Sequence, residues 1–489
     1  MNIYEQHEIK GWFFLPEYPD NRVPGVLKWD PFKGAEIELM GGLSLLVTPD
    51  LESGGIYVIT DEIVASMPAQ TIYLETEAGK KYSIWDAWRS GYSINHILEK
   101  IHEERWLSRL VYVGDHVLSE ENAFIKATFY IDGLYYLVND SRILPPEWCK
   151  MDGVERPGER LENGTFLLPY RLPVLGGFKA GKSEGNTKDA CYSVNTFATR
   201  PWISEATEAD PWLKLRFMLK HQRHGLALTI SVGANIGITL RKNGEETEVL
   251  EGTASDFLDK FVPIHDLMRL ATFHPCAVAK VQLQLKNNHD DGYLLKKVNE
   301  VARPDESYDD GNVVFTLNDV SLENFLEKRE YFTDTDGAIS PWRILIGLCG
   351  YFSNYAEEYI SQSFAAAEGF HKLCLDKSER YTLKERLKDL YSLLPQEVQE
   401  KLKLDVDEWV KHAVEARNHA AHGGPRRSDG SMSVSDRYVI AASVFLVTYL
   451  VVLNELGVPS EKITQALCSH PKISTVMSYC DEVRSMLEL

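Results

Sequence analysis

One stretch near the C-terminus, from about Asp436 to Leu456, is apolar on nearly every side of a predicted helix. It contains the longest apolar run of the chain, Val439 to Leu453, and Gly457 ends it. The run is too short to span a bilayer, and it includes hydroxyl-bearing residues such as Ser443. A helix without a polar face has to be surrounded by other protein. We therefore expect this helix at the centre of a helical domain or at a subunit interface.

The start of the chain has a different pattern, in which short segments of alternating apolar and polar residues are separated by Gly and Pro. The clearest predicted strands are Ile9–Leu15, Val23–Trp29 and Ala35–Met40, and further short strands are expected near Tyr57, Ile72, Val111 and Ala127. Pro24 and Gly25 in the second run suit an edge strand or a bulge. Strands at this spacing with such turns predict antiparallel sheets arranged as a sandwich or a barrel.

The middle of the chain mixes loops with isolated periodic segments. Residues Asn139 to Lys188 are rich in Pro and Gly, and residues 306–312 form an acidic loop. The predicted elements are a strand pair over Gly225–Gly237, a helix over Asp256–Leu270, a strand over Val278–Leu285 and a last strand-like run at Val313–Leu317.

Beyond this run the periodicity is helical. The predicted helices are Tyr351–Leu375, Thr382–Leu394, a helix that ends before Gly423, the apolar helix described above, and one or two short helices after Ser460. We place a domain boundary between about Glu323 and Pro341. The sequence thus predicts an α+β chain, with a β-rich domain over residues 1–322 and an all-α bundle over residues 323–489.

Composition and local motifs exclude several classes of protein. A length of 489 residues predicts two or three domains, and 44% hydrophobic with 25% charged residues suits a soluble globular protein. The polar start has no signal peptide, and the seven cysteines form no C-x-x-C pair, which favours the cytoplasm and no structural zinc. Because no Walker loop, dinucleotide fingerprint or nucleophile elbow is found, we expect no cofactor and no metal.

The net charge of −20 argues at first against a nucleic-acid partner, but it is unevenly distributed. Residues 346–489 carry 16 Lys and Arg against 20 Asp and Glu, so that most of the negative charge lies earlier in the chain. Arg426 and Arg427 follow the helix that ends before Gly423. They are candidates for an RNA-binding patch, and the alternative is a solvated loop.

The helix that ends before Gly423 is marked at both ends. Asp405 followed by Glu408 resembles a capping box, and Gly423–Pro425 is a stop signal. Its apolar residues have the spacing of one buried stripe, namely Val406, Trp409, Val410, Ala413, Val414, Ala420 and Ala421. Arg417 falls in the middle of this stripe, where a charge is costly unless it is paired or functional. His422 lies at the last helical position.

These residues resemble the motif of HEPN ribonucleases, in which an arginine is followed by a polar residue, three further residues and a histidine. Arg417, Asn418 and His422 match it, as do the preceding helix, the glycine-marked break and the long apolar helix that follows. The N-terminus is similar to the first domain of ApeA-type anti-phage proteins, which join a β-rich domain to a HEPN domain. The matching residues are Gly11–Pro16, Val23–Leu27, Gly34 and Glu36–Leu39.

The resemblance implies a metal-independent endoribonuclease that works as a homodimer, with Arg417 and His422 as catalytic residues. RNA supplies its own 2′-hydroxyl nucleophile, so a histidine with a pKa near about 6.5 and a charge-stabilising arginine suffice. The products would be a 2′,3′-cyclic phosphate and a 5′-hydroxyl. Since five helical residues turn about 140°, the helix has to end or kink before His422 for both side chains to reach one phosphate.

The resemblance also implies a partner and a trigger. The protein would be silent until infection and would then cut host RNA, with transfer RNA as one candidate. The N-terminal domain would sense a phage component or restrain the nuclease. No membrane partner is expected.

Other polar residues of the helical domain have two interpretations each. Asn418 either orients His422, four residues later, or is a polar residue near a helix end. Glu368 and His371 either complete a polar cluster around Arg417 or form an ordinary surface pair.

Several histidines are expected to have no functional role. His412 and His419 lie opposite the apolar stripe and should be exposed to solvent. His265, His274 and Cys276 have no zinc spacing and are predicted to be core or loop residues.

Two further classes of function remain open. One is a non-catalytic HEPN module that binds RNA or a nucleotide and pairs with another protein. The other is a β domain that binds carbohydrate or peptide and carries a helical dimerisation tail.

Overall fold

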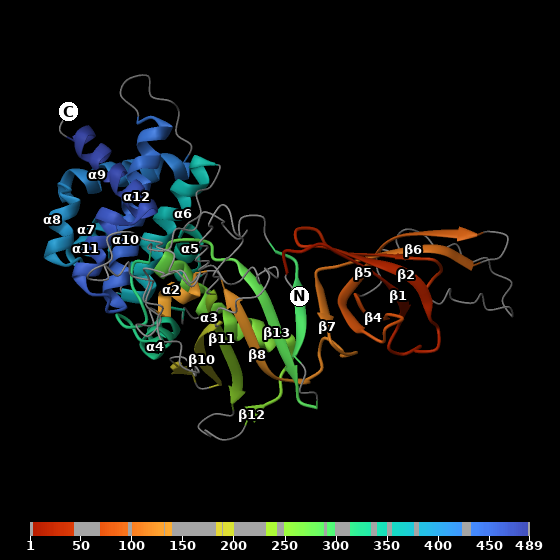
Figure 1. Cartoon of the computed structure of the whole chain (residues 1–489). Helices are drawn as coiled ribbons and strands as arrows, with labels where there is room; N and C mark the ends of the chain where they lie inside the picture. Colours follow the sequence, from red (N-terminus) through yellow and green to blue (C-terminus); the bar gives the residue numbers. More distant parts are fainter. Residues whose placement is uncertain are drawn as a thin grey trace, which may run out of the picture.

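The computed structural model describes residues 3–43, 69–95, 100–131, 133–138, 182–187, 189–199, 231–241, 249–287, 291–298, 313–333, 340–349, 355–375, 381–422 and 432–487. A β-rich N-terminal region is followed by a helical C-terminal region (Figure 1). The α+β class and the order of its parts are therefore confirmed. The strand expected near Tyr57, most of the loop 139–188 and the acidic loop 306–312 lie outside the described residues.

The first strands form a closed barrel. They are β1 (His7–Phe14), β2 (Val23–Asp30), β3 (Gly34–Leu39), β4 (Gln70–Glu75), β5 (Lys81–Asn95) and β6 (Lys100–Ser108). Antiparallel pairing joins them in the order β4–β1–β2–β3–β6–β5, and β4 also pairs with β5, which closes the ring. An apolar cluster that includes Trp29, Ile37 and Trp106 fills the interior. Closure removes the exposed strand edge that an open sheet would have at this point.

The prediction that Pro24 and Gly25 mark an edge strand or a bulge is wrong. They lie inside β2, which pairs with β1 and β3 in an unbroken register. A Cβ atom on Gly25 would stand 2.6 Å from the carbonyl oxygen of Glu38, so only glycine allows the strands to approach this closely.

The sheet continues beyond the barrel. Its further strands, in pairing order after β5, are β7 (Leu110–Val113), β14 (Asp291–Lys296), β13 (Val278–Leu285), β8 (Phe124–Ile131), β11 (Ser231–Arg241), β10 (Ala190–Thr199) and β9 (Lys182–Asn186), and β12 (Val249–Leu250) pairs with β11. The short helix α2 (Leu134–Val138) and the long helix α3 (Ala254–Thr272) pack on this part. The rings of Phe129 in β8 and Phe261 in α3 stack with centroids 4.1 Å apart.

The helical region is a bundle around one central helix. Its helices are α4 (Leu322–Thr333), α5 (Pro341–Leu348), α6 (Ala356–Phe370), the π-helical segment η2 (His371–Leu375), α7 (Leu383–Ser392), α8 (Gln396–Leu402), α9 (Val406–His422), α10 (Val434–Glu455), α11 (Ser460–Ser469) and α12 (Pro471–Leu487). The central helix α10 packs against α6, α9 and α12 (Figure 1). Within the described ranges α10 alone has the length and composition of a membrane span, but 83% of its most apolar stretch is buried in the protein. Its predicted central position is confirmed.

Helix α3 joins the sheet to the bundle. The hydroxyl of Tyr449 in α10 donates a hydrogen bond of 2.7 Å to the carbonyl of Leu270 in α3. His470 Nε2 lies 3.2 Å from the carbonyl of Thr272, and the ring of Phe273 contacts Tyr449 edge-on. One continuous apolar core therefore runs from the second part of the sheet through α3 into the bundle. The proposed domains, 1–322 and 323–489, meet at the start of α4 without a break in this core.

Several predicted elements need correction. Val313–Leu317 is not a strand, because its amides bond to helix ends: Val314 N–H to Ala271 O, and Leu317 N–H to Leu137 O. The described part of the predicted strand pair at 225–237 belongs to the single strand β11, which pairs with β10 and β8. The predicted helix up to Leu375 changes to π-helix at His371, and α2, α4, α5 and α8 were not predicted.

Candidate functional site

Helix α9 is fixed at its start by a cap and in its middle by burial. Asp405 Oδ1 accepts hydrogen bonds from the backbone N–H groups of Asp407 and Glu408, at 3.1 and 3.2 Å. The carboxylate of Glu408 accepts from Lys411, so only the first half of the expected capping box is seen. Trp409 is buried, and its Nε1–H donates to Ser443 Oγ of α10 at 2.8 Å. The first turns of α9 are thereby held rigidly against the central helix.

Arg417 lies at the edge of the buried face of α9, not in its middle as predicted. Its side chain is 36% exposed, and its Nε–H donates to Glu368 Oε1 of α6 at 3.2 Å. Glu368 is itself 31% exposed. In the described part of the chain, this bond occupies one donor of the guanidinium and leaves both Nη groups for another ligand.

Helix α9 remains helical through His422. The expected end of the helix before this residue is therefore not present. On a regular helix, positions 417 and 422 lie about 140° apart, so one copy of α9 presents them in different directions. The side chain of His422, together with Arg426 and Arg427, lies outside the described residues. Asn418 is exposed, one helical turn before His422.

His371 does not join Glu368 and Arg417, and it is not part of a surface pair. It is fully buried, with Nε2 2.6 Å from Asp389 Oδ2 and Nδ1 3.0 Å from Arg386 Nη1. Because arginine can only donate, Nδ1 is the acceptor and the proton resides on Nε2. Three helical residues separate the two side chains by about 60°, which directs Glu368 toward α9 and His371 toward α7. His371 thus ties η2 to α7.

Comparison with known protein families finds a match for both the β-rich and the helical part of the chain. Residues 8–167 and 229–329 match the ApeA N-terminal domain 1, and residues 349–462 match the ApeA-like HEPN domain. The chain belongs to the ApeA family. Neither a curated protein nor a solved structure matches it significantly. The helical bundle of this ApeA-type chain is accordingly a defence-associated module of the nuclease type, and Arg417, Asn418 and His422 all lie within it.

Two residues near the motif of this ApeA-type chain were missed by the sequence reasoning. His419, expected to be exposed, is half-buried, and its Nδ1 accepts a hydrogen bond of 2.9 Å from Arg437 Nη1 of α10. Arg437 is only 8% exposed. The sequence contained one signal for this contact. Arg437 lies at the start of an otherwise apolar helix, and a buried charge requires a partner.

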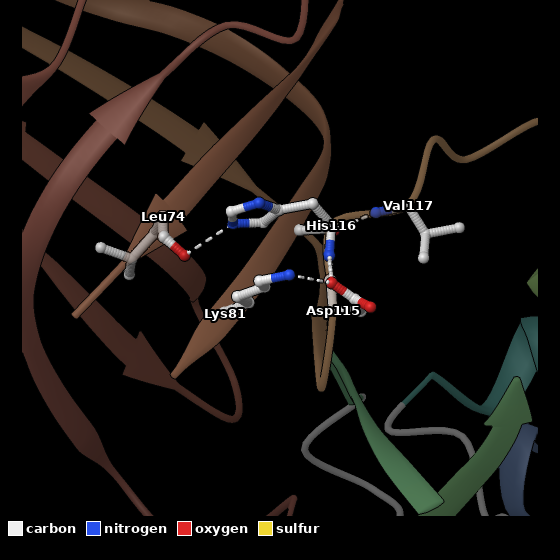
Figure 2. Close-up of polar contacts among 6 residues, drawn as sticks. Leu74, Lys81, Asp115, His116 and Val117 are labelled. Atoms are coloured by element: carbon white, nitrogen blue, oxygen red, sulfur yellow. Dashed lines mark hydrogen bonds and ion pairs between the residues drawn. The ribbon is translucent and has the colours of Figure 1, made fainter. Parts of the chain in front are cut away.

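A second polar cluster lies in the barrel of the ApeA-type chain (Figure 2). Lys81 Nζ contacts Asp115 Oδ1 at 2.8 Å, and the same oxygen accepts from the backbone N–H of His116. His116 Nε2 donates to the carbonyl of Leu74 at 3.2 Å, and its ring stacks on Tyr73. Burial lowers the pKa of His116, which the bond to Leu74 only partly offsets. The contacts of Lys81 and of the His116 ring link β5 and β4 to the segment after β7, so the cluster ties this segment to the barrel.

The remaining histidines near α3 are structural. His265 Nε2 lies 3.1 and 3.0 Å from the carbonyls of Pro275 and Cys276, and burial lowers the pKa of His265. His274 and Cys276 are both buried. These residues are core residues, as predicted.

Proposed function

We propose that the protein is a metal-independent endoribonuclease of anti-phage defence that acts in the cytoplasm and cleaves host RNA, with transfer RNA as one candidate. The observation that carries this proposal is the position of Arg417. In the matched HEPN domain, Glu368 holds its Nε, and no described residue occupies either Nη group, which leaves both for a phosphate.

The proposed chemistry follows from the residue types. The 2′-hydroxyl of the RNA attacks the adjacent phosphorus, and the bond to the 5′-oxygen breaks. His422 accepts the proton that the 2′-hydroxyl loses and delivers a proton to the departing 5′-oxygen, and the guanidinium of Arg417 stabilises the charge that develops on the phosphorane. The products are a 2′,3′-cyclic phosphate and a 5′-hydroxyl. Asn418 orients His422, and Arg426 and Arg427 contact RNA phosphates.

The helix geometry supports a homodimer. Because α9 stays helical through His422, one protomer directs Arg417 and position 422 about 140° apart. A second copy of the chain, related by two-fold symmetry, would place the complementary residue of each motif at a shared cleft.

The β-rich N-terminal domain, residues 1–322, is the proposed sensor for a phage-encoded trigger. Most of the net charge of −20 lies before the helical bundle, so this part can also repel RNA from the resting site. Helix α3, bonded to α10 through Leu270 and Tyr449, is the physical link between sensor and nuclease.

The test compares wild type, Arg417→Ala and His422→Ala in cells under phage attack, followed by sequencing of RNA ends. His412→Ala is the matched control, because His412 lies on the same helix, 4.0 Å from Glu408. Wild type and the control should protect cells and generate new 5′-hydroxyl ends, whereas both motif variants should do neither. Equal protection by all four proteins would refute the catalytic proposal.

A non-catalytic binding module is the second candidate. The ion pair between Arg417 and Glu368 favours it, because an arginine with a purely structural role would be paired in the same way. Binding of intact RNA by the purified protein, without cleavage in extract of infected cells, would support this candidate. A change of oligomeric state alone in Arg417→Ala would instead indicate a dimerisation tail.

A further inference from the structure

Arg437 is a buried cation without an acidic partner in the described part of the chain. Its Nη1 donates to His419 Nδ1 at 2.9 Å, and its Nε lies 3.4 Å from the carbonyl of Ser433. The nearest carboxylate in sequence, that of Asp436, accepts from the backbone N–H of Ser433 as part of the cap of α10. A buried charge whose partners are all neutral contributes little to stability. A role in stability therefore does not explain why Arg437 lies at this position.

The contact fixes the protonation of His419. A guanidinium cannot accept a hydrogen bond, so Nδ1 of His419 is unprotonated and the imidazole is neutral with its proton on Nε2. The hydrogen bond therefore has one direction: Arg437 of α10 is the charged donor, and His419 of α9 is the acceptor.

The contact also has a particular place in the bundle. It joins the last turn of α9 to the first turn of α10, on either side of the segment 423–431. Position 422 lies about 60° around the helix from position 419, whereas position 417 lies about 160° away. Arg417 is held by α6 through Glu368, and His419, on the nearly opposite face of α9, is held by α10 through Arg437.

We propose that Arg437 and His419 are positioning residues for the nuclease site: Arg437 holds the last turn of α9, and with it the backbone of His422, against α10. This inference rests on the proposed function. Without the contact the last turn would fray, as helix ends do, and the imidazole of His422 would lose its direction relative to the scissile phosphate.

The proposal is tested on the full-length protein with two independent readouts. The first is amide hydrogen exchange over the last turn of α9, which reports whether that turn is held. The second is the initial rate of cleavage of total transfer RNA in extract of infected cells, measured over a range of RNA concentrations to separate kcat from KM.

Arg437→Met should raise exchange in the last turn of α9 about tenfold, since a hydrogen bond that involves a charged group is lost. It should lower kcat by a similar factor and leave KM unchanged, because other residues hold the RNA. Arg437→Lys keeps a donor, and His419→Asn keeps an acceptor near the position of Nδ1, so both should recover most of kcat. His419→Leu should behave as Arg437→Met, and His412→Ala as wild type.

The outcomes separate this inference from the proposed function. Unchanged exchange in Arg437→Met, or raised exchange with unchanged kcat, would overturn the positioning role. A uniform rise in exchange over the whole bundle would also overturn it, since it would indicate a general stabilising role. If wild type itself cleaves no RNA, the proposed function fails, and the exchange data still decide whether Arg437 holds α9.

Discussion

At the scale of single residues, Arg417 shows how a weak interaction can matter for function. Its bond to Glu368 joins two side chains that are each about a third exposed, and such pairs contribute little to stability. Its effect is to set the direction of the guanidinium, with Nε turned to α6 and neither Nη group in contact with a residue of the described ranges.

Glu368→Gln is therefore expected to change the free energy of unfolding by less than about 1 kcal/mol, as measured by urea denaturation. The same variant should slow RNA cleavage roughly tenfold, because the neutral amide still accepts from Nε but holds the guanidinium less firmly than the carboxylate does. Glu357→Gln, exposed in the first turn of α6, is the control and should affect neither quantity. A large loss of stability with normal cleavage would show that the pair is structural.

His116 is expected to make the barrel sensitive to acid. Because burial lowers its pKa in the folded protein, its neutral form is favoured by folding. The stability that this contributes is complete above the unfolded pKa of about 6.5 and is lost as the pH falls through the folded pKa.

Urea unfolding at about pH 7.5 and about pH 5.5, on either side of the ordinary histidine pKa, measures this effect. His116→Gln retains a donor for the carbonyl of Leu74 but does not titrate. Its loss of stability between the two pH values should be smaller than that of wild type. An equal loss would show that other groups carry the acid sensitivity.

At the scale of elements, the approach of α5 to α6 depends on one glycine. A Cβ atom on Gly369 would stand 2.9 Å from Cβ of Pro341, closer than two carbon atoms can pack. Gly369 follows Glu368 directly. The packing of α6 against α5 therefore also affects where the Glu368 carboxylate lies relative to Arg417.

Gly369→Ala should destabilise the protein by about 1–3 kcal/mol, the usual cost of overpacking. Gly347→Ala in α5 is the matched control, because a Cβ atom there meets nothing within 4 Å. Alanine favours helix over glycine, so the control should gain up to about 1 kcal/mol. Urea denaturation measures both variants, and equal effects would contradict the packing argument.

At the scale of the whole molecule, two apolar cores divide the chain differently from the predicted domain boundary. One fills the barrel of β1 to β6, and the other extends from β8, β11 and β13 through α3 into the helical bundle. The second part of the sheet therefore shares one core with α9 and α10, so that a change in its packing would act on both helices. The barrel, with its own core, can respond separately.

Tyr449→Phe removes the hydroxyl that bonds to the carbonyl of Leu270 and should cost about 1–3 kcal/mol, because the acceptor stays buried. Hydrogen exchange should rise in α3 as well as in α10 and remain unchanged in β1 to β3. Tyr391→Phe, whose hydroxyl bonds to Gln399 O within the bundle, should affect only α7 and α8. Exchange that rises in α10 alone would show that α3 is not part of the same cooperative unit.

The sequence by itself determined the elements that carry the proposed site and the family to which the chain belongs. The apolar spacing of α9, the unbroken apolar run of α10 and the alternating strands β1 to β3 are local patterns, so they could be read from neighbouring residues. Arg417, Asn418 and His422 were found for the same reason, since they lie within one helix.

Only the tertiary structure decided which residues meet. The closure of the barrel by β4 and β5, the choice of Glu368 and not His371 as the partner of Arg417, and the bond from Arg437 to His419 all join distant segments. Each depends on how helices are rotated against one another or how strands pair. A local pattern shows which face of an element is buried, but it does not specify which residue of another element lies against it.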